Sequence, residues 1–148
     1  MKLFSTPNSP FSRMARVAIH ELRLTEKVDV ESVTVRDPKR KLLKYGPLGK
    51  VPALLVNDEL FSDSRIVVNK IESLAESGKL TAKIDDSASL SFEGFCIGFL
   101  ESIAVWVREA RRKQELISQE LLEVERSRAI RCVEYLSQNM EHLRNSNN

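Results

Sequence analysis

The sequence predicts an α/β domain over residues 1–80, followed by an all-α segment over residues 85–148. In the first part, short apolar runs alternate with amphipathic stretches in the order strand, helix, strand, helix, strand, strand, helix (βαβαββα). The polar residues 79–86 form a linker. After it, apolar residues recur at helical spacing over two long stretches, which predicts helices over residues 87–113 and 118–143.

The first strand and the first helix are separated by turn-forming residues. Residues 2–5 are a short apolar run, and residues 6–8 (TPN) are typical of a turn. Ser9 has the character of a helix N-cap, with Pro10 at the first helical position, where a missing N–H costs little. Residues 28–33 are apolar at about every second position, which predicts a half-buried second strand.

A basic, weakly helical segment over residues 37–45 precedes the second half of this domain, and residues 46–49 (GPLG) end it. Residues 51–56 predict a strand that contains a proline. Residues 59–61 predict its hairpin partner after a short turn. The basic side chains of the segment are typical of a solvated face.

Asp63 or Ser62 is the expected N-cap of the next helix, which should end near Gly78. The first strand–helix–strand crossover favours parallel pairing, and the later hairpin favours antiparallel pairing.

Composition is that of a soluble globular protein. Hydrophobic residues make up 42% and charged residues 30% of the chain. The net charge of +2 is too close to balance to indicate a nucleic-acid partner. The two cysteines, Cys96 and Cys132, form no disulfide framework or metal motif, and His20 and His142 have no partners at ligand spacing, so we expect no metal site.

The chain shows no apolar segment typical of a secretory signal. Its longest apolar stretch, Phe95 to Val107, is shorter than the roughly 20 residues that a membrane helix needs. A reducing, cytoplasmic setting without a membrane partner is therefore the default expectation.

Three short motifs together predict one small-molecule site. Ser9 places a hydroxyl at a helix start, Pro52 follows Val51 at a strand start, and Asp63 with Ser64 places an acid and a hydroxyl at a second helix start. Each also has a purely structural interpretation, because Ser and Asp are common N-caps and proline is tolerated at the start of a strand.

These motifs resemble the glutathione S-transferase family. The matching stretches are residues 6–16 (TPNSPFSRMAR), 46–54 (GPLGKVPAL) and 60–65 (LFSDSR). The resemblance covers residues 1–80 well and the remainder by helix pattern alone. It implies a thioredoxin-like N-terminal domain that binds glutathione, followed by a partial helical domain, in a truncated family architecture.

Within this resemblance, Ser9 is the residue that activates the glutathione thiol. A free thiol has a pKa near ~8.5 and must lose its proton to become a nucleophile. A helix N-terminus favours the thiolate, and a hydroxyl there can donate a hydrogen bond to it. Ser12, one turn further on, is the alternative candidate.

The resemblance also implies binding residues for the rest of glutathione. The peptide bond between Val51 and Pro52 should be cis, so that the Val51 backbone pairs with the cysteinyl part of the ligand. Ser64 would bind the γ-glutamyl carboxylate and Asp63 its ammonium, although the family more usually has Glu-Ser here. Independently of the resemblance, Lys50 is a candidate to reach a ligand carboxylate, and Lys39 and Arg36 are the alternatives.

Two functions remain open on this basis. The first is a glutathione transferase, with glutathione as cosubstrate and a small electrophile as second substrate, acting as a homodimer through the helices at 87–113 and 118–143. The second is a non-catalytic binding or regulatory module, like the stringent-starvation-type members of the family. Complete members carry further helices that build the acceptor pocket, so that pocket would be incomplete here. A disulfide reductase is disfavoured because position 9 holds no cysteine.

Overall fold

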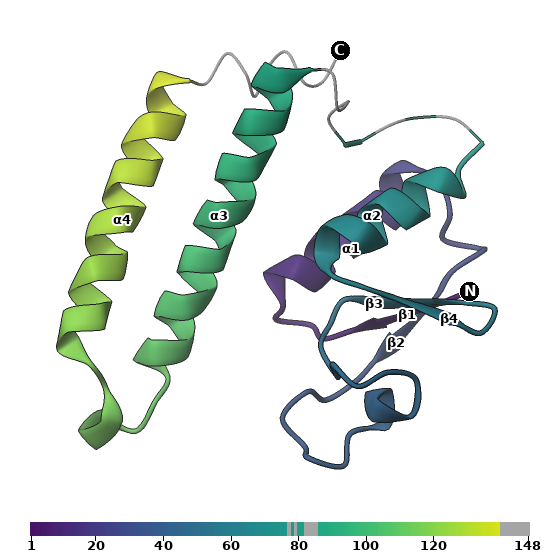
Figure 1. The fold of residues 1–148 in the computed structure, drawn as a ribbon, viewed down its shortest axis with the longest axis horizontal. Helices are drawn as coiled ribbons and strands as arrows, with labels where there is room; N and C mark the ends of the chain where they lie inside the picture. The colour runs from purple at the N-terminus through teal and green to yellow at the C-terminus, as the bar shows by residue number, and fades with distance from the viewer. Residues whose placement is uncertain (77, 79, 82–85, 140–148) are drawn as a thin grey trace. The chain divides into compact units, whose positions relative to one another are not determined.

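The computed structural model describes residues 1–76, 78, 80–81 and 86–139. The chain forms two compact units, Met1–Thr81 and Ala82–Asn148 (Figure 1). Residues 79 and 82–85 of the predicted linker, and the predicted helical positions 140–143, lie outside the described residues.

The first unit follows the predicted order of elements with one change. Its elements are β1 (Lys2–Ser5), α1 (Pro10–Glu21), β2 (Asp29–Ser32), the 3₁₀ turn η1 (Lys41–Lys44), β3 (Ala53–Val56), β4 (Glu59–Ser62) and α2 (Ser64–Ser73). Helix α2 ends before the predicted position near Gly78.

The weak helix predicted over residues 37–45 is only the short turn η1. The Asp37 carboxylate accepts a hydrogen bond from the Lys39 amide at 2.8 Å, a local turn that competes with helix formation. Within η1 only Leu42 is buried, so no apolar face stabilises a longer helix.

The sheet has the order β2-β1-β3-β4. β1 pairs with β2 in parallel, as the first crossover predicts, and with β3 in antiparallel fashion. β3 and β4 form the predicted antiparallel hairpin. β1 and β4 therefore run in the same direction on the two sides of β3.

Both faces of the sheet are covered. Helices α1 and α2 lie together over one face (Figure 1), where Leu3, Leu54 and residues of both helices form the main core. On the other face, Leu42 of η1 packs with Phe4 and Ala53 in a smaller core. The turn η1 is thus held to the sheet by apolar burial, which fixes the start of the loop that leads to β3.

The second unit is a hairpin of two long helices, α3 (Ser87–Ala110) and α4 (Gln119–Gln138), joined through η2 (Gln114–Leu116). The two predicted helices are present, and they lie side by side (Figure 1). Phe95 of α3 packs on Tyr135 of α4 with ring centroids 4.5 Å apart. Aromatic contacts of this kind contribute beyond simple area burial.

Two buried carboxylates join the helices of the hairpin. Glu125 of α4 accepts a hydrogen bond of 2.5 Å from the Ser102 hydroxyl of α3 and pairs with Arg128. Glu109 of α3 accepts a bond of 2.8 Å from the Ser118 amide at the start of α4. These hydrogen bonds lower the pKa of both glutamates below the ordinary value of 4.5.

The hairpin should therefore lose stability in acid. Because the folded-state pKa values of Glu109 and Glu125 are lowered, their contribution is complete above pH 4.5 and is lost as the pH falls through the folded values. Urea denaturation followed by the fluorescence of Trp106, the single tryptophan, reports on this unit. We expect a lower midpoint at about pH 3.5 than at pH 7.

The double variant Glu109→Gln, Glu125→Gln should flatten this pH dependence. The matched control is Glu31→Gln in the first unit, whose carboxylate also has a lowered pKa because Lys41 and Lys2 donate hydrogen bonds to it. An unchanged acid response in the double variant, or the same flattening in the control, would contradict this account.

Helix α3 also meets the length and composition expected of a membrane span. Its apolar window has a mean hydropathy of 1.5, and 6% of that window is buried. The sequence-based judgement of membrane-spanning length used the apolar residues 95–107 alone. That judgement was wrong, because the whole helix has 24 residues and meets the length of a membrane span. Ser102 and Glu109 of this helix are bonded to α4 and its N-cap, so in this structure α3 is one half of a helical hairpin.

Candidate functional site

The register of the sheet brings the three motifs to one edge. Ala53, the first residue of β3, lies between Phe4 of β1 and Ser62 of β4. Neighbouring strands are about 4.8 Å apart. Three segments therefore lie side by side in the first unit. They are the end of β1 that leads to Ser9, the residues just before Ala53, and Asp63 just after Ser62.

Ser9 is the N-cap of α1, as predicted. Its Oγ accepts a hydrogen bond from the Ser12 amide at 3.1 Å, and its carbonyl accepts one from the Arg13 amide at 3.0 Å. Ser9 is half-buried. Because Oγ acts as acceptor in the cap, the hydroxyl proton of Ser9 remains available for a ligand. Capping the helix and donating to a thiolate are thus compatible.

Ser12 is placed differently from Ser9. It has an exposed fraction of 0%, and its Oγ has no hydrogen-bond partner among the described residues. Its side chain is enclosed under the first turn of α1. Ser9 is thus partly accessible from solvent, whereas Ser12 is not.

The peptide bond between Val51 and Pro52 is cis, as the resemblance implies. Pro52 is buried, and Val51 is half-buried against the smaller core. Val51 precedes β3 and takes no part in its pairing with β1 or β4. Lys50 beside it is exposed.

Asp63 and Ser64 form the start of α2. One carboxylate oxygen of Asp63, Oδ1, accepts hydrogen bonds from the amides of Arg65 at 2.9 Å and Ile66 at 3.5 Å. Asp63 is exposed, and its φ of +76° with ψ of 136° lies outside the left-handed helical region in which Asp and Asn are enriched. Its Oδ2 makes no hydrogen bond in the described part of the chain, so it remains open to a cation.

Ser64 is the first residue of α2 and is buried, with an exposed fraction of 7%. The Asp63 carboxylate and carbonyl satisfy the next three amides of the helix. The Ser64 amide makes no hydrogen bond within the described residues. A free amide at a helix N-terminus is a favourable site for an anionic group.

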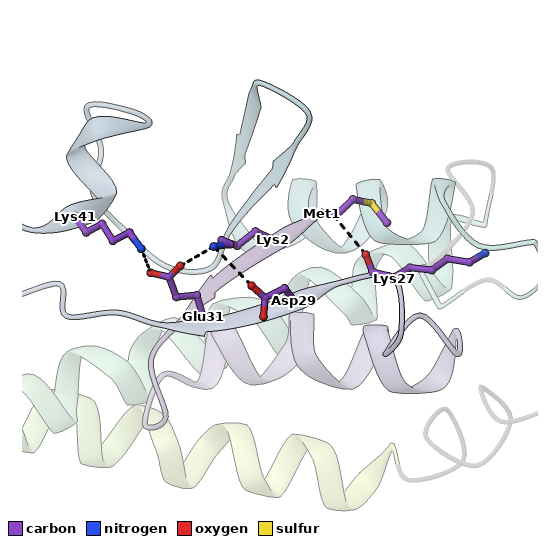
Figure 2. Close-up of polar contacts among 6 residues, drawn as sticks. All are labelled: Met1, Lys2, Lys27, Asp29, Glu31 and Lys41. Atoms are coloured by element: carbon purple, nitrogen blue, oxygen red, sulfur yellow. Dashed lines mark hydrogen bonds and ion pairs between the residues drawn. The ribbon is translucent and has the colours of Figure 1, made fainter.

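Sequence reasoning missed the role of two basic residues in the loop before Val51. Lys41 and Arg40, expected in a solvated face, both make specific contacts. Lys41 bonds to Glu31 of β2 at 2.6 Å, and Lys2 of β1 bonds to the other oxygen of Glu31 at 2.9 Å (Figure 2). Arg40 donates to the Gly49 carbonyl at 3.0 Å. A basic composition alone carries no signal for such partners.

The three motifs lie at one edge of the sheet, and the comparisons with known proteins assign the family to which this fold belongs. Residues 3–79 match the model of the family described as "Glutathione S-transferase, N-terminal domain". This match covers more than half of the chain, and the chain belongs to the glutathione S-transferase family. The first unit is accordingly a thioredoxin-like domain, followed by a helical segment. No curated protein sequence matches the chain.

Solved structures support the same assignment. A glutathione S-transferase from Methylobacillus flagellatus with glutathione bound is 26% identical, with a TM-score of 0.81 over 95% of this chain and 70% of that one. A family member from Pseudomonas fluorescens with bound glutathione is 27% identical, with a TM-score of 0.77 over 91% and 69%. Both of these neighbours were solved with glutathione bound.

A third neighbour shows the fold alone. It is a glutathione S-transferase from Methylobacterium radiotolerans in complex with glutathione sulfonate. It is 20% identical, with a TM-score of 0.76 over 93% of this chain and 65% of that one.

Proposed function

We propose that this chain binds glutathione along the edge formed by Ser9, Val51 and Ser64, and activates its thiol for attack on a small electrophile. The observation that carries this proposal is the register Phe4–Ala53–Ser62, which aligns the three motifs. The neighbours from M. flagellatus and P. fluorescens, which hold glutathione, support the choice of ligand.

In the proposed reaction, the cysteinyl thiol of glutathione loses its proton to water at the start of α1. The Ser9 hydroxyl donates a hydrogen bond to the resulting thiolate, and the N-terminal end of α1 adds favourable charge. The first turn of α1 contains no acidic residue that would oppose a thiolate. The thiolate then attacks the electrophile, whose leaving group departs with the bonding electrons.

The remaining parts of glutathione are held by backbone and by charge. The Val51 backbone, outside the β3 ladder, pairs with the cysteinyl unit in the manner of an added strand. Ser64 offers its free amide and hydroxyl to the γ-glutamyl carboxylate, and Oδ2 of Asp63 faces the ammonium. Exposed Lys50 reaches the glycine carboxylate.

The chain is proposed to form a homodimer through the helices at 87–113 and 118–143 of the second unit. It is also proposed to act in the cytoplasm. Apolar side chains that remain exposed on α3 and α4, such as Val105, Val124 and Val133, support a partner on this hairpin. The same exposure is the observation that favours the alternative function, a glutathione S-transferase-like regulatory module that binds another protein.

The test separates the two functions. The full chain is passed over immobilised glutathione and titrated with glutathione by calorimetry, and turnover is then measured with a generic aryl halide. Retention with turnover supports the transferase, and retention without turnover supports the regulatory module. If the chain shows neither glutathione binding nor turnover, the proposed glutathione site is ruled out.

A further inference from the structure

We infer that Arg40 is a positioning residue for glutathione, which acts by holding the segment Gly49–Val51 in its binding conformation. The inference rests on the proposed function, since it concerns the same site. It assigns to Arg40 no contact with the ligand: the guanidinium acts through the backbone that precedes Val51.

The guanidinium of Arg40 bridges two distant points of one loop. Its Nε donates to the Gly49 carbonyl at 3.0 Å, and its Nη1 donates to the Asp37 carbonyl at 3.1 Å. Arg40 is half-buried. The planar fork of arginine makes such paired bonds in a fixed geometry, which a lysine ammonium does not reproduce.

Gly49 is shaped to receive this side chain. Its φ is +56°, and a Cβ at this position would lie 2.3 Å from Nε of Arg40. The guanidinium therefore occupies the space that a side chain would take. The Gly49 carbonyl shares a rigid peptide plane with the Lys50 amide, so fixing the carbonyl also fixes the direction in which the chain enters Val51.

The base of this clamp is itself anchored to the sheet. Lys41, next to Arg40, is ion-paired with Glu31 of β2 (Figure 2), and Leu42 has an exposed fraction of 1%. The backbone of Arg40 is thus held on the sheet. Its side chain transmits that rigidity to Gly49, nine residues along the chain.

The test compares Arg40→Ala and Arg40→Lys with the control Lys44→Ala. Lys44 is an exposed basic residue of the same loop that has no hydrogen bond or ion pair in the described residues. Titration with glutathione should show affinity at least about tenfold weaker in Arg40→Ala, only partly restored by Arg40→Lys, and within about twofold of wild type in Lys44→Ala.

A second readout needs no ligand. Backbone ¹⁵N order parameters of Lys50 and Val51 should fall from about 0.85 towards 0.6 in Arg40→Ala, while the thermal midpoint stays within a few degrees. Wild-type affinity in Arg40→Ala would overturn the inference. So would weaker binding that comes with unchanged order parameters and a matching loss of thermal stability, because Arg40 would then act only on overall folding.

Failure of the proposed function gives a different result. If the wild-type chain does not bind glutathione, the proposed function is wrong and the ligand part of the inference is overturned with it. The order parameters then decide, without ligand, whether Arg40 fixes the segment Gly49–Val51: a fall supports that structural part, and no change overturns it as well.

Discussion

Replacing Ser9 by alanine is expected to lower turnover of an aryl halide by about 10²-fold or more. The variant removes one positioned donor to the thiolate, and losses of this size follow removal of a single charge-stabilising donor. The pH–rate profile should also move, because the glutathione thiol would return towards its free pKa near ~8.5. Steady-state rates between about pH 6 and 9 measure both effects.

Loss of the helix cap must be separated from loss of the donor. Ser9→Ala also removes the bond to the Ser12 amide, at a cost of about 1 kcal/mol in helix stability. Ser118→Ala is the matched control, because its Oγ caps α4 through the Leu121 amide at 3.2 Å in the same geometry. It should lose similar stability and keep full turnover.

Ser12→Ala tests the alternative thiol activator. The buried Ser12 hydroxyl has no partner among the described residues, so its removal should leave stability and turnover nearly unchanged. If Ser9→Ala kept full turnover while Ser12→Ala lost it, the thiol activator would be Ser12.

Replacing Asp63 by asparagine is expected to weaken glutathione binding by about 10- to 100-fold, the range of a hydrogen bond to a charged group. Asparagine keeps an oxygen that can cap α2, and it has the same shape as aspartate, so it meets the backbone at φ +76° in the same way. Only the negative charge that would face the ligand ammonium is lost. Calorimetric titration of both proteins measures the difference.

A ligand variant completes this experiment. Glutathione without its α-amino group should bind wild type and Asp63→Asn with nearly equal affinity. Neither complex can then form the ion pair between residue 63 and the ligand ammonium. Asp63→Ala is the contrasting variant, since it also removes the bonds to Arg65 and Ile66 and should lower thermal stability. An Asp63→Asn protein that binds glutathione as tightly as wild type would rule out the ammonium contact.

Local signals account for the parts of the fold that the sequence predicts well. Ser9, Asp63 and Ser118 are N-caps in the structure, and each is visible as a polar residue just before a helical apolar pattern. The strand pairing follows from the crossover and the hairpin. The position of the three motifs at one edge follows in turn, because each motif directly adjoins an element that the pattern places.

The features that sequence reasoning missed depend on specific contacts between residues, which composition and periodicity do not reveal. Glu109 and Glu125 look like surface glutamates of amphipathic helices, and only the packing of α3 on α4 shows that they are buried. The bond from Arg40 to Gly49 depends on a loop whose path no periodicity predicts. The short turn η1 was overestimated as a helix because composition does not reveal the competing turn at Asp37.

All three motifs of the proposed site belong to the unit Met1–Thr81. Cofactor recognition and choice of electrophile would then be modular properties. Evolution or design could then change the helical hairpin to accept new electrophiles while the glutathione site stays the same. A graft of residues 1–81 onto another helical segment would transfer the thiol-binding site with it.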